Sequence, residues 1–206
     1  GYKTKKLDIV LQNQSLVPNA YVGLAPLRSE FFASPPQDNR MDGSTNWIDQ
    51  LSIHEYRHAL QFINARYGLT KIGYYLSGES GWAVMMNLSL PDWYFEGDAV
   101  LAETQYSSQG RGRISSFFNN SRTLEQMNIR YDYAKARNGS LIDRVPNHYE
   151  MGFLMLAYGS ETFGEEVWEK VIRDAGSYRS PFYPFSAALK RHTGLNSRDF
   201  YNSSMN

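Results

Sequence analysis

The sequence contains no cysteine, no long apolar run and no excess of either charge. The absence of cysteine excludes disulfides, thiolate metal sites and cysteine nucleophiles. The 21 basic and 21 acidic residues balance. Because binding to a phosphate backbone requires a concentrated positive field, we expect no nucleic-acid partner. No apolar stretch approaches the roughly 18 residues of a membrane-spanning helix, so we expect no membrane span.

Histidine is also scarce, with four in 206 residues, namely His54, His58, His148 and His192. A chain of this length fits one domain with a core of its own, and we expect a single domain over residues 1–206. The chain begins with Gly1-Tyr2 and has no initiator methionine. We therefore expect its natural start to lie upstream.

The first 45 residues differ from the rest in the pattern of their apolar residues and prolines. Short apolar or β-branched runs over 7–11, 20–24 and 30–33 alternate with prolines, which predicts three strands joined by turns. The polar stretch 37–45 then leads into helical periodicity that continues to the end. Strands followed by helices predict an α+β fold with a small N-terminal sheet (1–45) and a helical body (46–206).

Residues that can cap or stop a helix indicate where the expected helices begin and end. The first runs from about 46 to 67, with Asn46 as its cap and Gly68 as its stop. The next begins near 91–92 and reaches about 106. Later helices are expected over 148–163, 165–175 and 185–192, whereas the polar segment 130–146 reads as a long loop.

The segment His54-Glu55-Tyr56-Arg57-His58 carries the strongest chemical signal. Two histidines four residues apart lie one turn above each other on a helix, so both imidazoles can reach one ion. Glu55 points away from that axis and can reach a water on the ion. With a carboxylate as third ligand, zinc lowers the pKa of such a water, and Glu55 can act as general base.

Glu96 is the best candidate for the third ligand. It lies at a helix start among the aromatic residues 93–95, and an unpaired carboxylate buried there would be costly without a cation. Gly97 leaves room either for close helix packing or for the approach of the histidine-bearing helix. Either Asp98 or Glu103 can hold the second nitrogen of a ligand histidine, and the sequence does not choose between them.

The two segments, His54 to His58 and Trp93-Tyr94-Phe95-Glu96-Gly97, together resemble the gluzincin zinc metallopeptidases. The match is to the branch whose third-ligand helix reads Trp, two residues, Glu, Gly. This resemblance implies a zincin-like fold with His54, His58 and Glu96 as zinc ligands and Glu55 as general base. It also implies that a sheet edge within 20–33 lies along the cleft.

The resemblance extends to the helix expected from 148, where a tyrosine three residues before a glycine stabilises the oxyanion. Tyr149 is the corresponding residue here, and a phenol is a neutral donor at pH 7. The chain has fifteen tyrosines, and His148 and Tyr158 are rivals for the role. His192, at a basic helix end, reads as structural. Arg111-Gly112-Arg113 reads as a solvated turn.

Three functions fit these patterns. The first is a zinc peptidase acting on a peptide or protein substrate. The second is a zinc-binding but inactive scaffold or interaction domain, and the third is a helical interaction domain with an accidental motif. The residues do not separate endopeptidase from aminopeptidase action. The resemblance also suggests a further domain C-terminal to this chain and an extracytoplasmic location, periplasmic or secreted.

Overall fold

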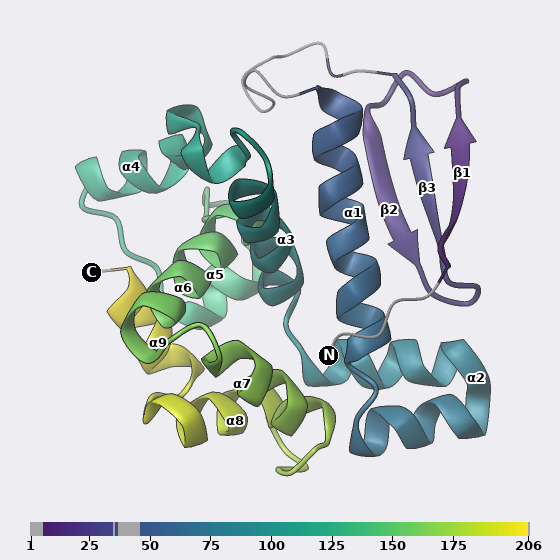
Figure 1. Ribbon diagram of the computed structural model, residues 1–206. Coiled ribbons are helices and arrows are strands. Elements are labelled where there is room, and N and C mark those ends of the chain that lie inside the picture. The colour runs from purple at the N-terminus through teal and green to yellow at the C-terminus, as the bar shows by residue number, and fades with distance from the viewer. Residues whose placement is uncertain (1–5, 35, 37–45, 206) are drawn as a thin grey trace.

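The computed structural model describes residues 6–34, 36 and 46–205. A three-stranded sheet comes first and helices follow it, so the expected α+β fold with a small N-terminal sheet is confirmed (Figure 1). The polar stretch 37–45 lies outside the described residues.

The sheet has the order β1-β3-β2. β3 (Arg28–Phe32) lies in the centre, parallel to β1 (Asp8–Gln12) and antiparallel to β2 (Asn19–Gly23). The three expected strands are found within two residues of their predicted bounds. β2 is an edge strand and lies beside α1 (Trp47–Asn64), the helix that bears the histidines (Figure 1).

Sheet and α1 share a small apolar cluster in which Ala20 and Phe31 contact Leu51. Asn46 caps α1 as predicted, because its side chain accepts a hydrogen bond from the Ile48 amide at 2.9 Å. The helix ends at Asn64, three residues earlier than expected. The prediction that Gly68 stops it is wrong.

Gly68 instead begins α2 (Gly68–Ser89), a helix that the sequence analysis does not predict. Its backbone leaves helical geometry at Ser77 and at Gly78 (φ 61°), which divides α2 into two arms. A Cβ on Gly81 would lie 2.4 Å from the Gly73 carbonyl oxygen. The glycines that make this segment look unlike a helix are therefore what allows its arms to touch.

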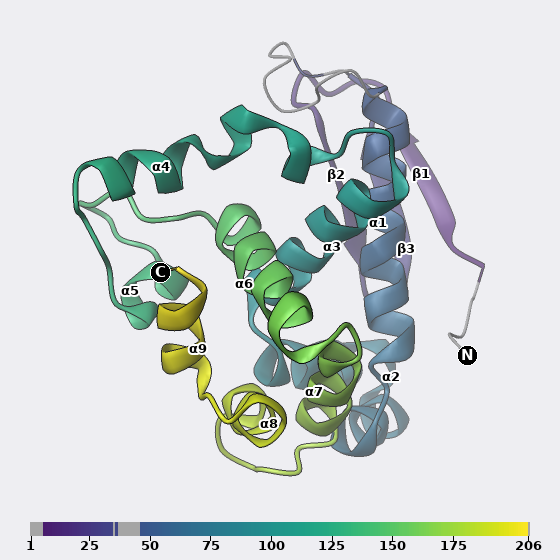
Figure 2. The same cartoon turned by 60° about the vertical axis from the view of Figure 1, so that its left-hand side comes forward.

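α3 (Asp92–Tyr106) and α6 (His148–Phe163) have the predicted bounds and form the centre of the body (Figure 2). They cross at two glycines, and a Cβ on Gly97 would lie 2.2 Å from the Gly152 carbonyl carbon. Gly97 thus serves close packing against α6, which is the first of the two roles expected for it. The buried Trp93, Met151 and Met155 belong to the core around this crossing.

The other elements complete the body. They are η1 (Arg111–Arg113), η2 (Ser115–Phe118), α4 (Asn119–Gln126), α5 (Tyr133–Asn138), α7 (Val167–Gly176), α8 (Pro184–Thr193) and α9 (Ser197–Ser204). The predicted loop 130–146 is wrong in part, because Asp132 caps α5 by accepting from the Lys135 amide. Among residues 6–34, 36 and 46–205, no helix combines the length and apolar character needed to span a bilayer.

Candidate metal centre

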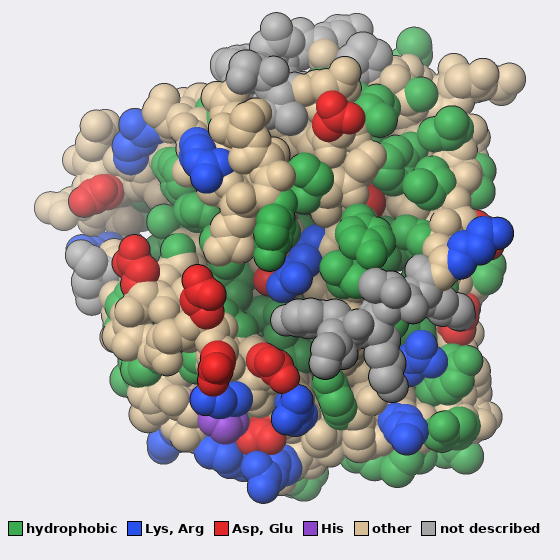
Figure 3. Space-filling model, in the orientation of Figure 1, with side chains coloured by type: hydrophobic (Ala, Val, Ile, Leu, Met, Phe, Trp, Pro, Cys, Tyr) green, Lys and Arg blue, Asp and Glu red, His purple; other side chains and the backbone are tan. Residues whose placement is uncertain are grey.

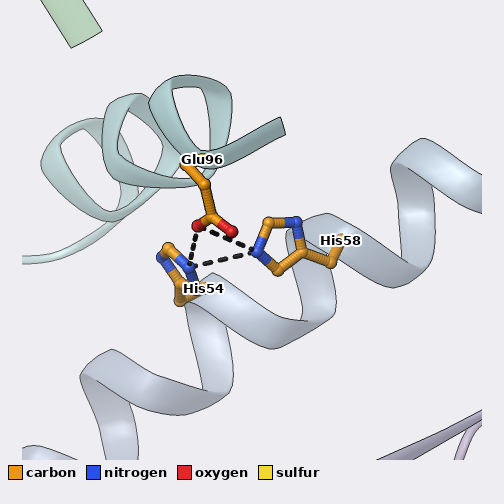
Figure 4. A group of neighbouring side chains, drawn as sticks. All are labelled: His54, His58 and Glu96. Carbon is orange, nitrogen blue, oxygen red and sulfur yellow. Dashed lines mark hydrogen bonds and ion pairs between the residues drawn. The ribbon is translucent and has the colours of Figure 1, made fainter. Parts of the chain in front are cut away.

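His54 and His58 on α1 meet Glu96 on α3 (Figure 4). The two imidazole Nε2 atoms lie 3.1 Å apart, and Glu96 Oε2 lies 3.3 Å from that of His54 and 3.5 Å from that of His58. Ligands about 2.0–2.1 Å from a tetrahedral zinc ion are about 3.3–3.4 Å from one another. The three side chains therefore have the spacing of three corners of a zinc tetrahedron, which leaves the fourth free.

The second nitrogen of each imidazole fixes its tautomer. His54 Nδ1 lies 2.5 Å from the Glu103 carboxylate, which can only accept, and 2.7 Å from Arg111 Nη2, which can only donate. The contact with the carboxylate is the shorter of the two, and we assign the proton of His54 to Nδ1 on that basis. His58 Nδ1 lies 2.9 Å from Gln61 Oε1. The Gln61 amide is oriented by its nitrogen, which donates to the Phe95 carbonyl at 3.0 Å. Both Nδ1 atoms therefore carry protons, and both Nε2 lone pairs point at the same place.

The space between these three side chains attracts positive charge. Burial opposes ionisation of Glu96, but the two imidazoles beside it hold its pKa well below the usual range. Burial also opposes charge on His58, yet Glu96 raises the pKa of that imidazole. Glu96 Oε2 is buried and makes no hydrogen bond within the described part of the chain. A divalent cation would supply the charge and the missing partner together.

Glu55 lies beside the ligands without being one of them. Its residue is 3% exposed, and burial raises the pKa of its carboxyl although both histidines lower it. Its Oε2 is buried and, among the residues that the structure describes, has no hydrogen-bond partner. This carboxylate is thus free to accept a proton from a water next to the cluster.

Tyr149 also lies at the candidate metal centre, and the crossing of α3 and α6 brings it there. It lies one turn before Gly152, and its ring centroid is 6.0 Å from that of His54. Burial and the nearby Glu96 carboxylate raise the pKa of Tyr149 to about 12. The phenol therefore remains a protonated donor throughout the neutral range.

The rivals of Tyr149 are engaged elsewhere. His148 Nε2 lies 2.8 Å from the Arg137 carbonyl oxygen, and Tyr158 packs on Phe200 with ring centroids 5.3 Å apart. His192 makes the structural contact expected of it, to Asp174 at 2.9 Å. Of the three candidates for the oxyanion donor, only Tyr149 lies beside the histidine pair.

The structure also decides between Asp98 and Glu103. Glu103 is fully buried and contacts His54 directly, and its pKa is lowered to about 2 because Arg111 and His54 outweigh burial. Asp98 acts one step further away, since its Oδ2 accepts from Gln61 Nε2 at 2.6 Å. Arg57 binds Asp98 with two hydrogen bonds, of 2.6 and 2.8 Å.

The prediction that Arg111-Gly112-Arg113 forms a solvated turn is wrong for Arg111. Its side chain is 13% exposed and forms an ion pair with Glu103. Arg113, in the same short helix, is exposed and donates to backbone carbonyls of Ser107 and Gln109. Only Arg113 fits the prediction. The one signal in the sequence was Gly110, whose φ of 61° turns the chain back toward α3.

No family model, no curated protein and no solved structure matches this chain in the three comparisons made. The resemblance to gluzincins therefore remains an interpretation of the motifs.

Proposed function

We propose that this chain is a zinc-dependent metallopeptidase. The observation that carries the proposal is the buried Oε2 of Glu55, which has no hydrogen-bond partner in the described part of the chain and lies next to three convergent ligand atoms. A site built only to hold a metal has no need of a base in that position. The intact glutamate thus favours an enzyme over an inactive zinc-binding scaffold, which is the alternative.

Each side chain has a defined task. His54, His58 and Glu96 would hold zinc, which when bound lowers the pKa of a water toward neutrality and polarises the substrate carbonyl. Glu55 takes a proton from the attacking water and returns it to the leaving amine. Tyr149 donates a hydrogen bond to the oxygen on which negative charge develops.

The proposal is tested with Glu55→Gln, which keeps the shape of the side chain and removes the base. The variant should retain one zinc per chain by metal analysis and lose about 10²–10⁴-fold in turnover of a quenched peptide library, which is the usual contribution of a general base. Glu125→Gln, at an exposed position on α4, is the matched control.

Three results would contradict the proposal in different ways. Turnover that is unchanged in Glu55→Gln would refute the mechanism. A wild-type protein that binds zinc and cleaves no library peptide would favour the scaffold. A wild-type protein that takes up no zinc from a zinc-containing buffer would refute both metal functions and leave the helical interaction domain.

A further inference from the structure

Arg111 is held against α3 by the turn that precedes it. A Cβ on Gly110 would lie 2.5 Å from the Thr104 Cα, so the chain reverses in direct contact with the helix. The Gly112 amide then donates to Thr104 Oγ1 at 3.1 Å. These two attachments on either side fix the start of the Arg111 side chain over the end of α3.

The guanidinium of Arg111 completes the surroundings of Glu103. Its Nε lies 3.0 Å from Glu103 Oε2, and its Nη2 contacts Oε1. Oε2 also accepts from Gln50 at 3.2 Å, while Oε1 faces His54 Nδ1. Glu103 is fully buried, so Arg111 is the cation that allows a charged carboxylate to stand behind His54.

The same guanidinium supports Tyr149. Its Cζ lies 4.9 Å from the centroid of the Tyr149 ring, which is the geometry of a cation–π contact. The same ring also lies beside His54, with ring centroids 6.0 Å apart. One arginine thus contacts the carboxylate that orients the first histidine, the tyrosine expected to bind the oxyanion and the histidine itself, whose Nδ1 lies 2.7 Å from Arg111 Nη2.

The balance of charge at the site also depends on Arg111. Three carboxylates lie at this site, the buried ones of Glu55 and Glu103 and the partly exposed one of Glu96. A divalent cation together with one guanidinium balances them. Without Arg111 the site would carry one uncompensated negative charge, placed on a carboxylate that water cannot reach.

We propose that Arg111 is a positioning residue of the metallopeptidase site, with two separable effects that rest on the function proposed above. Its positive charge compensates that of Glu103, so that this carboxylate accepts a hydrogen bond from Nδ1 of His54 and keeps Nε2 directed at the metal. It also fixes the ring of Tyr149 through the face of its guanidinium, so that the phenol points at the developing charge.

The test compares Arg111→Met with Arg113→Met, because both arginines belong to η1 and only Arg111 contacts the site. Zinc affinity is measured by competition with a chelator, and kcat and KM are measured at saturating zinc. Arg111→Met should lose about 10–100-fold in zinc affinity, as is usual when a supporting partner is removed. Its kcat should fall about 10-fold or more with little change in KM, whereas Arg113→Met should match the wild type.

A double variant, Glu103→Gln with Arg111→Met, separates the two effects. Glutamine at position 103 can accept a hydrogen bond from Nδ1 of His54 and carries no charge that needs a cation. Zinc affinity should therefore return to within a few-fold of the wild type. The Tyr149 ring remains unsupported, so kcat should stay low. This variant also buries no unpaired charge, and it serves as the test if Arg111→Met alone does not fold.

The outcomes distinguish this inference from the function on which it rests. If the wild type binds zinc and cleaves peptides while Arg111→Met matches Arg113→Met in both measurements, the role of Arg111 alone is refuted. If zinc affinity does not recover in the double variant, the charge effect is refuted. If kcat recovers together with zinc affinity, the effect on Tyr149 is refuted. A wild type without zinc and without activity overturns both proposals.

Discussion

Histidine lies against a carboxylate in two regions of this molecule, and the two regions differ. Between α7 and α8, Asp174 accepts from Arg191 at 2.7 Å, from His192 at 2.9 Å and from Arg179 at 3.2 Å. Basic side chains gather over this region of the surface (Figure 3). At the candidate metal centre, Glu96 Oε2 faces two imidazoles and forms no hydrogen bond with the residues that the structure describes. The first group is complete without an ion, and the second is not.

The orientation of the imidazole rings accounts for this difference. His192 turns its Nε2 toward Asp174 as one of three donors. At the candidate metal centre, Glu103 and Gln61 each accept a hydrogen bond from the Nδ1 of a histidine, so the Nε2 atoms next to Glu96 are acceptors. A histidine close to a carboxylate therefore suggests a metal site only where other partners have already fixed its second nitrogen.

The largest effect is expected from Glu96→Ala. This change removes the proposed third ligand, so zinc affinity should fall by more than the 10–100-fold that loss of a supporting hydrogen bond causes. Metal analysis after gel filtration should find less than a tenth of an equivalent, by order of magnitude. Asp174→Ala is the control and should keep its zinc. A Glu96→Ala protein with full zinc content would move the third ligand elsewhere and would remove the contrast between the two regions.

Removal of zinc from the wild type should have the next largest effect. An ion that binds only the folded state at about 1,000 times its dissociation constant stabilises that state by about 4 kcal/mol. Unfolding in urea should therefore shift to lower concentration after treatment with a chelator. Glu96→Ala should show no such shift, because it has no zinc to lose. An equal response of the two proteins to the chelator would mean that zinc acts outside this site.

Gln61→Met tests the neutral support of His58. Methionine fills a similar volume but lacks the amide oxygen that accepts a hydrogen bond from Nδ1 of His58. Zinc affinity should therefore fall by about 10-fold, at the lower end of the range for lost supporting partners. The loss should be smaller than that of Arg111→Met, which leaves a carboxylate uncompensated. Gln105→Met, at an exposed position on α3, is the control. A loss as large as that of Glu96→Ala would show that Gln61 does more than orient the ring.

The sequence predicted those parts of the site that depend on spacing within one helix. His54 and His58 are related by a single turn of α1, and Asn46 marks the start of that helix. Glu96 was found because a carboxylate among buried aromatic residues needs a partner. Tyr149 could be suggested only by resemblance, since its position depends on the contact of Gly97 with Gly152, and no local pattern encodes that contact.

The parts that were missed depend on contacts between distant residues. No helix is predicted over residues 68–89, where Gly73 and Gly81 allow the two arms of α2 to touch and Gly78 turns the chain between them. Arg111 read as a solvated residue because its partner, Glu103, belongs to another helix and to a buried network. Local propensity describes a residue's own backbone, and it says nothing of which neighbour a fold will bring to its side chain.

The smallest effect is expected from Asp174→Asn, which completes the comparison. The pKa of Asp174 is lowered, because burial is outweighed by hydrogen bonds from Arg191, His192 and Arg179. Since the folded-state pKa is below the unfolded one, this carboxylate stabilises the protein at pH values above the unfolded pKa. That stabilisation disappears as the pH falls through the folded pKa. The side chains of Arg179 and Arg191 are exposed, so solvent screens their charges and the loss at pH 7 should be about 1 kcal/mol.

Urea unfolding at a series of pH values measures the effect. The wild type and Asp174→Asn should differ at neutral pH and converge in acid, where protonation removes the charge from the wild-type carboxyl. Zinc affinity should be the same in both proteins, because the group around Asp174 already has its cations. A change in zinc affinity, or a difference in stability that persists at the lowest pH, would mean that the two regions are coupled. The contrast between a carboxylate whose cations are all in the protein and one that needs a metal ion would then be wrong.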